Sequence, residues 1–280
     1  MVKGPEKWSG RTVVITGGAR GIGEATAAAF LSHGARVVLC DVDREVFETA
    51  SRLGCQARLV DVRILSDVRA TVLDIEETTG AIDVWVNNAG IMLLGGFLEQ
   101  PDDQDRRQIE INLVGVLNGM KAVLPQMVAR GRGHIVNVAS MAGRIAVPYA
   151  ATYSATKFAV VGLTEAVRLE FAPAGIDFSY VMPVPVKSEL MSGAGTMRWP
   201  RPVEIADVAA AIVEGAAARQ VEIYVPRHQR APVVLSGLVP RRIYDLAAKA
   251  SGLTKIFGSV DARARAAYSA RVQGSKPLVG

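Results

Sequence analysis

Short apolar runs alternate with amphipathic segments along most of this chain, and this alternation limits the folds that it can adopt. The runs are rich in Val and Ile and apolar at almost every position, which is typical of strands buried on both faces. The alternation therefore predicts an α/β fold, a doubly wound parallel sheet of about seven strands with helices on both faces. The predicted strands are residues 12–16, 36–40, 56–60, 82–86, 135–139, 177–181 and 221–225. The predicted helices are residues 24–32, 44–53, 65–78, 102–129, 153–171 and 204–218.

Length and composition fit one domain with an added segment. The chain has 280 residues, half of them hydrophobic, and we predict a single domain over residues 1–225 and an extension over residues 226–280. Cys40 and Cys55 have no evident pairing, and no Cys/His cluster has metal-ligand spacing, so we expect reduced thiols and no metal. The N-terminus has no signal-peptide pattern and no apolar run approaches the ~20 residues of a membrane span, which favours a cytoplasmic protein.

A glycine-rich turn separates the first predicted strand from the first predicted helix. Gly17, Gly21 and Gly23 would let backbone N–H groups and the helix N-terminus meet a pyrophosphate, as in Rossmann-type domains. Asp41 ends the next strand, where a carboxylate can bind the adenosine ribose hydroxyls. Because a carboxylate there repels a 2′-phosphate, Asp41 favours NAD over NADP. Arg20 lies in the turn itself, and its guanidinium could bind a 2′-phosphate, which favours NADP.

The segment from Ser140 to Lys157 carries groups suited to proton transfer. If Tyr153 opens a helix, Lys157 lies on the same face, with its ammonium close to the phenol. A neighbouring cation lowers the pKa of a phenol, so Tyr153 could exchange a proton with an alcohol or carbonyl oxygen. The hydroxyl of Ser140 could hold that oxygen. Taken alone, the Tyr–Lys spacing also fits an ordinary helix start.

The carboxyl ends of parallel strands lie on one rim of a sheet, and ligands of open α/β sheets bind there. Asp61, residues 87–90, Ser140 and Pro183 all follow predicted strands. We therefore expect them on the same rim as the glycine turn.

Together these residues resemble the short-chain dehydrogenase/reductase family over residues 10–225. The resemblance rests on T-G-x-x-x-G-x-G at residues 16–23, N-N-A-G at residues 87–90, Asn112, Ser140 and Tyr153-x-x-x-Lys157. It implies that Tyr153 is the general acid/base, that Ser140 orients the substrate oxygen, and that Lys157 holds the nicotinamide ribose. It implies further that Asn112 holds a water of a proton relay. The dinucleotide-binding set that we expect comprises Gly17, Arg20, Gly21, Ile22, Gly23, Asp41, Asp61, Val62, Asn88, Ala89, Gly90, Tyr153, Lys157, Pro183, Val186 and Ser188.

One segment departs from the family pattern. After the sixth strand the family usually carries Pro-Gly and then a Thr, whereas this chain has Pro183-Val184-Pro185-Val186-Lys187-Ser188. Pro185 lacks a backbone N–H donor, so we expect Val186 and Ser188 to serve the nicotinamide end instead. Because of this departure, the family pattern does not predict the local shape of the site around the nicotinamide and the substrate.

The expected substrate walls are residues 91–97, 141–149 and 187–199, which are rich in apolar side chains. They favour a lipophilic alcohol or ketone of the steroid, retinoid or long-chain type, although the same residues could simply pack a lid. The leading interpretation is an NAD(H)-dependent oxidoreductase. The alternatives are an NADPH-dependent ketone or 3-oxoacyl-thioester reductase and a non-catalytic dinucleotide-binding protein.

The basic charge of the chain is concentrated beyond Tyr224. Residues 225–280 carry ten Lys/Arg and two Asp/Glu, a net +8, while the preceding residues carry 22 and 25, a net −3. Residues 240–250 have the pattern of a basic amphipathic helix, which could lie on a membrane, pack on the domain or cover the substrate entrance. A nucleic-acid role is disfavoured because the basic charge lacks interleaved aromatic residues. The family resemblance suggests a homodimer or homotetramer formed through the helices at residues 102–129 and 153–171.

Overall fold

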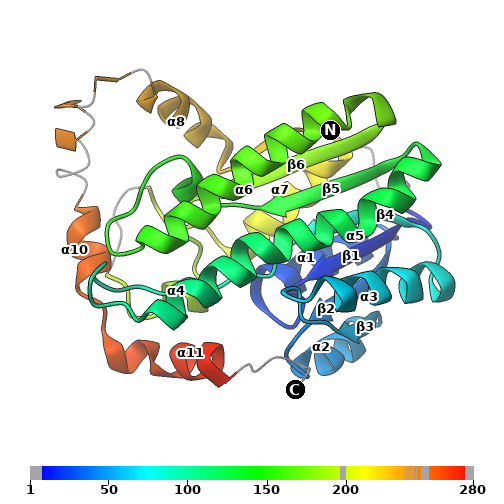
Figure 1. The fold of residues 1–280 in the computed structure, drawn as a ribbon, viewed down its shortest axis with the longest axis horizontal. Helices are drawn as coiled ribbons and strands as arrows, with labels where there is room; N and C mark the ends of the chain where they lie inside the picture. Colours follow the sequence, from blue (N-terminus) through cyan, green and yellow to red (C-terminus); the bar gives the residue numbers. More distant parts are fainter. Residues whose placement is uncertain are drawn as a thin grey trace.

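The protein, in a computed structural model, is built on one parallel sheet of seven strands (Figure 1). Residues 8–195, 200–237, 239–240, 242–243, 245–246 and 252–274 are described. The strand order is β3-β2-β1-β4-β5-β6-β7, so the chain winds outward from β1 in both directions, as the doubly wound prediction requires. The strands are β1 (Thr12–Thr16), β2 (Arg36–Asp41), β3 (Gln56–Leu59), β4 (Ile82–Asn87), β5 (Gly133–Val138), β6 (Ile176–Pro183) and β7 (Glu222–Val225).

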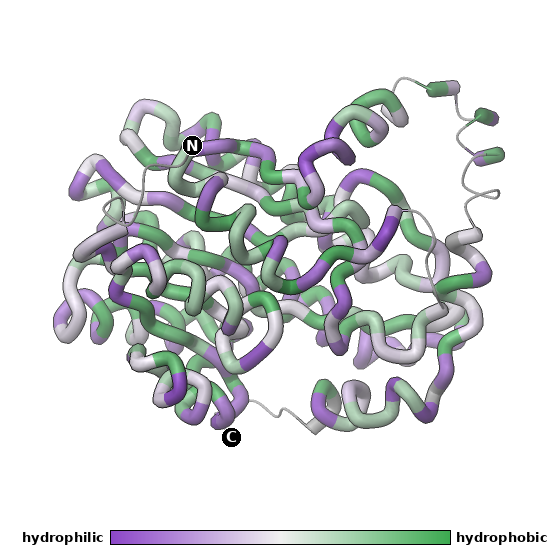
Figure 2. The backbone as a smooth tube through the Cα atoms, turned by 180° about the vertical axis from the view of Figure 1, so that it is seen from behind, coloured by the Kyte–Doolittle hydropathy of each residue, from purple (hydrophilic) through white to green (hydrophobic). Residues whose placement is uncertain are grey.

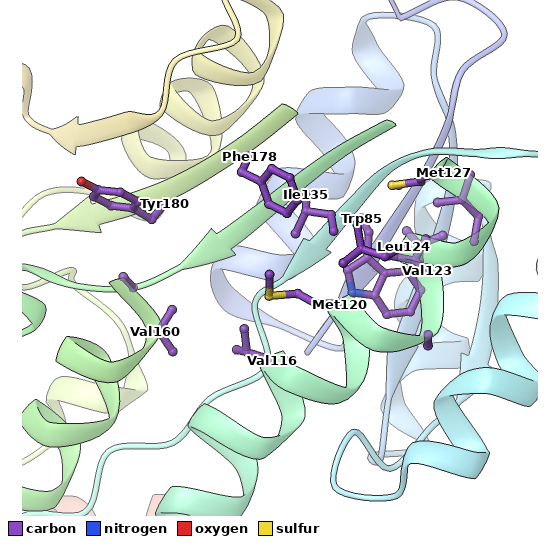
Figure 3. Packing of buried hydrophobic residues seen from close by; sticks show 14 of the residues in the cluster. Trp85, Val116, Met120, Val123, Leu124, Met127, Ile135, Val160, Phe178 and Tyr180 are labelled. Atoms are coloured by element: carbon purple, nitrogen blue, oxygen red, sulfur yellow. The ribbon is translucent and has the colours of Figure 1, made fainter. Parts of the chain in front are cut away.

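Helices cover both faces of the sheet. Those of the main body are α1 (Gly21–Ser32), α2 (Glu45–Leu53), α3 (Leu65–Thr78), α4 (Asp102–Ile109), α5 (Gly115–Arg130), α6 (Ala151–Glu170) and α7 (Ile205–Ala217). One buried cluster joins α3, α5 and α6 to the sheet, and Figure 3 shows Trp85, Met120 and Phe178 within it. A second cluster joins α1, α2 and α7 to the opposite face. Burial of each amphipathic helix against nearly continuous apolar strands therefore produces the three-layer fold.

The long helix predicted over residues 102–129 is interrupted. A π-helical turn, Glu110–Val114, lies between α4 and α5, and it contains Asn112. The sequence gives no sign of the turn, because apolar spacing does not distinguish one wide turn from a regular one. The prediction that Tyr153 opens its helix is also wrong by two residues, since α6 begins at Ala151.

The segment after β6 is more ordered than its Pro and Gly content indicates. Val184 is buried and its N–H donates to the carbonyl of Val225 at 2.9 Å. Val186 and Val203 form a parallel bridge, and a short 3₁₀ turn, Glu189–Met191, follows. The substitution of valine for the family's glycine is thus accommodated by turning residue 184 into the core.

The extension forms further helices. These are α8 (Arg230–Ser236), α10 (Leu253–Gly258) and α11 (Ala262–Gly274), and Figure 1 shows them outside the sheet and its covering helices. The basic amphipathic helix expected at residues 240–250 falls largely outside the described residues. No helix in the described part of the chain is long and apolar enough to cross a membrane.

Candidate active site

A cavity of about 1070 Å³ lies along the carboxyl ends of the strands. Every residue that the sequence assigned to catalysis or dinucleotide binding lines it, with two exceptions. Gly23 lies beneath the glycine turn and Asn112 lies behind Gly90. The rim predicted from strand order therefore exists, and it forms one continuous cavity.

The glycine turn is packed so closely that two of its positions exclude a side chain. A Cβ on Gly23 would lie 2.1 Å from the carbonyl oxygen of Gly17, and a Cβ on Gly17 would lie 2.8 Å from the Cα of Ala89. Gly21 has φ +62° and a Cβ there would meet no atom within 4 Å. Because Gly21 also lines the cavity, the turn presents open backbone at a helix N-terminus, and the pyrophosphate of a dinucleotide fits this arrangement.

Asn88 stabilises the turn through its side chain. Its Nδ2 donates to the carbonyls of Thr16 at 2.9 Å and Gly17 at 3.0 Å. The hydroxyl of Thr16 in turn accepts the backbone N–H groups of Asn88 and Ala89. The N-N-A-G segment therefore holds the end of β1 in place as well as lining the cavity.

Asp41 is held rigidly at the end of β2. Its carboxylate accepts the backbone N–H groups of Ala19 and Asp43, each at 3.0 Å. Burial raises the pKa of Asp41, and these hydrogen bonds partly oppose the rise. Arg20 forms ion pairs with Asp43, at 2.5 Å, and with Glu45. The Arg20 guanidinium, which we considered as a binder of a 2′-phosphate, is thus bound to two carboxylates.

Asp61 and Val62 form the neighbouring wall of the cavity. Asp61 is almost fully buried, and its carboxylate pairs with Arg63, at 2.5 Å between Oδ2 and Nη2. Asn118 on α5 donates to the carbonyl of Val62 at 2.8 Å. Polar contacts with neighbouring residues therefore fix both Asp61 and Val62 in the wall.

Tyr153 and Ser140 meet at the reaction end. Ser140 follows β5, and its hydroxyl accepts the N–H of Ala142 at 3.1 Å. Burial raises the pKa of Tyr153 to about 12, and a hydrogen bond with Ser140 only partly offsets this effect. The expectation that Lys157 lowers the pKa of the phenol is not met in this structure, because desolvation is the largest influence on that pKa and Lys157 is not among the groups that lower it.

Lys157 is buried and points at the backbone. Its Nζ lies 5.6 Å from the centre of the Tyr153 ring and donates to the carbonyl of Val138 at 2.8 Å. Burial lowers the pKa of Lys157 to about 8. A hydrogen bond to a single carbonyl leaves the ammonium with further donors for a ligand.

Asn112 is fully buried rather than exposed on a helix face. Its amide accepts the N–H of Ile91 at 2.8 Å and donates to the carbonyl of Ile91 at 2.8 Å. A Cβ on Gly90 would lie 3.3 Å from Asn112 Oδ1 and 3.7 Å from Lys157 Nζ. Asn112 therefore fixes the loop that follows β4 and lies beside Lys157.

Val186 and Ser188 are the residues that we expect at the nicotinamide end of the cavity. Val186 and Ser188 both line the cavity, and Ser188 donates its backbone N–H to the carbonyl of Val186 at 2.8 Å. Residues 196–199 of the expected substrate wall lie outside the described part of the chain.

Sequence reasoning missed the part of the lining that the extension supplies. These residues are Gln229, Pro232, Val233, Ser236, Phe257, Tyr268, Arg271 and Val272. The one available signal is the spacing of Arg265, Tyr268 and Val272, which places the three residues on one face of a helix.

The family model described as short chain dehydrogenase matches residues 11–199, more than half of the chain. The chain belongs to the short-chain dehydrogenase/reductase family. It is therefore an oxidoreductase acting on CH–OH groups, with a Rossmann-type fold that binds a nicotinamide dinucleotide.

Curated members of the dehydrogenase/reductase family are similar over most of their length. "Oxidoreductase UcpA" of Salmonella typhimurium is 40% identical over 190 residues, which cover 66% of this chain and 72% of that protein. "17-beta-hydroxysteroid dehydrogenase 13" of Rattus norvegicus is 32% identical over 244 residues, covering 84% of this chain and 81% of that protein.

Solved structures of this family superpose on the chain. A short-chain dehydrogenase/reductase from Burkholderia phymatum in complex with NAD has a TM-score of 0.75 and 27% identity, covering 82% of this chain and 94% of its own. A gluconate 5-dehydrogenase from Burkholderia cenocepacia in complex with NADP and tartrate has a TM-score of 0.70 and 30% identity. The match covers 77% of this chain and 92% of that one. The family thus includes binders of each dinucleotide.

Proposed function

We propose that this enzyme oxidises a lipophilic alcohol to its carbonyl with NAD, and that Tyr153 is the general base. One observation supports this proposal. Tyr153, Ser140 and Lys157 line the same cavity as Asp41 and the glycine turn, which lie at its other end. Bound NAD would supply the hydride acceptor for the carbinol carbon, and the glycine turn, Asp41 and Lys157 would hold it. Ser140 would hold the substrate oxygen, and Lys157 would bind the ribose beside it. Because burial keeps the Tyr153 phenol protonated near neutral pH, Tyr153 must first release its own proton before it can take the hydroxyl proton of the substrate.

Replacement of the phenol tests this assignment. Tyr153→Phe should lower kcat by at least about 10²-fold, because positioned acid/base catalysis contributes about 10²–10⁴-fold. The dissociation constant for NAD, measured by calorimetry, should stay within about twofold. Undiminished turnover would refute the role of Tyr153. Absence of turnover in the wild-type protein with every lipophilic alcohol and ketone tried would favour the non-catalytic alternative.

The charges at the adenosine end support NAD rather than NADP. Asp41 presents a carboxylate to the cavity, while Arg20 is paired with Asp43 and Glu45. A second anion beside a carboxylate is disfavoured by about 1–4 kcal/mol at 4 Å, depending on solvent access. This arrangement also speaks against an NADPH-dependent reductase.

Neutralising that carboxylate should relax the preference. We expect Asp41→Asn to raise kcat/KM with NADP relative to NAD about tenfold or more, because the repulsion is removed. Asp74→Asn is the control. It alters a surface carboxylate of α3 that pairs with Arg58, and it should leave the ratio unchanged. A wild-type enzyme that already prefers NADP would contradict the assignment.

A steroid-like or other bulky apolar alcohol suits the substrate end. Tyr153 belongs to a buried apolar cluster with Met92, Ala142 and Ala150, against which Leu190 packs. The similarity to a protein named as a hydroxysteroid dehydrogenase supports the same class.

A homo-oligomer through α4, α5 and α6 is a second part of the proposal. Ile109, Phe158 and Leu169 expose large apolar side chains on α4 and α6. Gln126 Oε1 and Arg168 Nε, on α5 and α6, are buried without a hydrogen-bond partner among the described residues. A second copy packed on these helices would cover the first group and could satisfy the second.

Peripheral contact with an anionic membrane is the third part. Val234, Leu235, Ile243 and Leu246 are more than half exposed. Figure 2 shows hydrophobic stretches in α8 and in the short pieces after it, at the margin of the molecule. Basic and apolar residues together favour an interfacial location. Flotation with anionic liposomes should carry the protein upward, and failure to float at low salt would end this idea.

A further inference from the structure

Helix α11 lies beyond the region that the family model matches, yet it contributes to the cavity. The match ends at residue 199, and α11 spans Ala262–Gly274. Tyr268, Arg271 and Val272 line the same cavity as Tyr153. Tyr268 is also close enough to contribute to the electrostatics of Tyr153. The extension therefore reaches the reaction end.

Arg265 connects α11 to two separate wall segments. Its guanidinium donates to the carbonyls of Leu190 at 3.0 Å and Ser192 at 2.8 Å, and also to that of Met92. Met92 follows β4, whereas Leu190 and Ser192 follow β6. Arg265 is 5% exposed. A buried guanidinium whose donors are taken by three carbonyls holds backbone in position.

Tyr268 makes a second connection one turn along the helix. Its hydroxyl accepts the backbone N–H of Met92 at 2.8 Å, so both polar groups of Met92 are bound by α11. The Tyr268 ring lies 4.8 Å from the Arg265 guanidinium carbon and packs with Leu93 and Val272. The two side chains thus form one buried unit.

The backbone of the segment after β6 is fitted to the extension as well. The N–H of Asp261 donates to the carbonyl of Gly193 at 2.8 Å, and the N–H of Gly195 donates to the carbonyl of Ile256 at 2.9 Å. Gly193 has φ +73°, and a Cβ there would lie 2.5 Å from the carbonyl oxygen of Asp261. This approach requires glycine.

We infer that α11 is the substrate-selecting wall of the cavity, and that Arg265 and Tyr268 are positioning residues that hold the loops after β4 and β6 around an apolar substrate. The wall presents Tyr268 and Val272 to the cavity beside Leu190 of the loop after β6. The charge of Arg271, which also lines the cavity, is paired with Glu189, and that of Arg265 is directed into backbone. Long alcohols would contact this wall, and short ones would not reach it. The selection rests on the proposed oxidation of a lipophilic alcohol, but the positioning does not.

Hydrogen exchange tests the positioning without any turnover. In the full-length protein, Tyr268→Phe removes the acceptor of the Met92 N–H, and Arg265→Met removes the three carbonyl contacts. We expect exchange in residues 91–94 and 188–195 to accelerate about tenfold in Arg265→Met, and exchange at Met92 to accelerate in Tyr268→Phe. Arg263→Met, an exposed position on the same helix, is the control. Unchanged exchange in both variants would overturn the inference.

Substrate selectivity then separates positioning from a merely structural role. With saturating NAD, Arg265→Met and Tyr268→Phe should lower kcat/KM for 2-decanol about tenfold more than for 2-propanol, chiefly through KM. Arg263→Met should not change that ratio. Equal losses for both alcohols would mean that α11 only stabilises the fold and would overturn its selecting role. If the wild-type enzyme oxidises neither alcohol nor a steroid alcohol, the proposed function fails, and the exchange result still decides the positioning.

Discussion

At the scale of single residues, the reaction end is a site where two ionisable groups are kept out of water. Tyr153 and Lys157 are both buried, and burial disfavours the charged form of each. Because the carbonyl of Val138 is the one hydrogen-bond partner of Lys157 among the described residues, the burial of its ammonium is only partly compensated at neutral pH. We interpret this as stability given up for ligand binding.

Removing the ammonium should therefore stabilise the fold at neutral pH. Burial lowers the pKa of Lys157 from 10.5 to about 8, which corresponds to an upper limit of about 3 kcal/mol below pH 8. Loss of the Val138 hydrogen bond offsets about 1 kcal/mol. At pH 7 the free energy of unfolding of Lys157→Met, measured in urea, should thus exceed that of the wild type by about 2 kcal/mol. The variant should lose activity.

The pH dependence gives the sign of the effect. Between about pH 8 and 10.5 the unfolded chain binds more protons at this residue than the folded protein, so wild-type stability rises with pH there. Above that window the penalty is gone, and the advantage of Lys157→Met should disappear. Lys121→Met, an exposed position on α5, is the matched control. An advantage that persists unchanged at pH 11 would contradict this explanation.

At the scale of elements, the turn between β1 and α1 is the most constrained part of the dinucleotide site. The Gly17 carbonyl approaches Gly23 so closely that a methyl group has no room. The side chain of Asn88 occupies the remaining space beneath the turn. Relaxation would have to displace backbone, which is costly in a packed interior.

Gly23→Ala should accordingly weaken NAD binding at least about tenfold and lower the free energy of unfolding by about 1–3 kcal/mol. Gly162→Ala is the contrasting change, because a Cβ on this exposed glycine of α6 meets nothing within 4 Å. Because Gly162 lies one turn from Phe158 on the proposed assembly surface, the contrast rests on NAD binding alone, and Gly162→Ala should keep the wild-type affinity for NAD. Calorimetry of both variants and urea unfolding of Gly23→Ala measure these effects. Equal NAD affinity in Gly23→Ala would show that the turn is not the pyrophosphate site.

Elements were predictable to the extent that local patterns encode them. All seven strands and the order of the helices follow from apolar runs and glycine stops, and the family motifs pointed to Ser140, Tyr153 and Lys157, which line one cavity. The π-helical turn around Asn112 was not predictable, because it changes hydrogen bonding without changing the apolar pattern. The pairing of Arg20 with Asp43 and Glu45 was also missed, since it depends on where α2 begins relative to the glycine turn.

At the scale of the whole molecule, the helices α4, α5 and α6 form the surface through which we propose assembly. In light scattering after gel filtration, we expect the wild-type protein to be a dimer or tetramer. Phe158→Glu should shift it to smaller species, because a buried carboxylate without a partner opposes association. Leu73→Glu, on exposed α3, should leave the mass unchanged. A monomeric wild-type protein at micromolar concentration would contradict the proposed interface.

The substrate end illustrates what the sequence could not reveal. Its outer wall comes from α11, and the contact between Met92 and Tyr268 joins residues 176 positions apart. The partners of Arg265 are backbone carbonyls, which every residue carries, so no motif marks them. The dinucleotide end, by contrast, is formed by side chains and glycines with characteristic spacing.

The chain order of these two ends has a consequence for biosynthesis. The sheet is complete at Val225, before a ribosome has made α11. A nascent chain of that length would already contain the glycine turn, Asp41 and Tyr153. Its loops after β4 and β6 would not yet be bound by Arg265 and Tyr268 of α11. In such a chain the dinucleotide site would precede the wall that we infer selects the substrate, so cofactor binding would come before substrate preference.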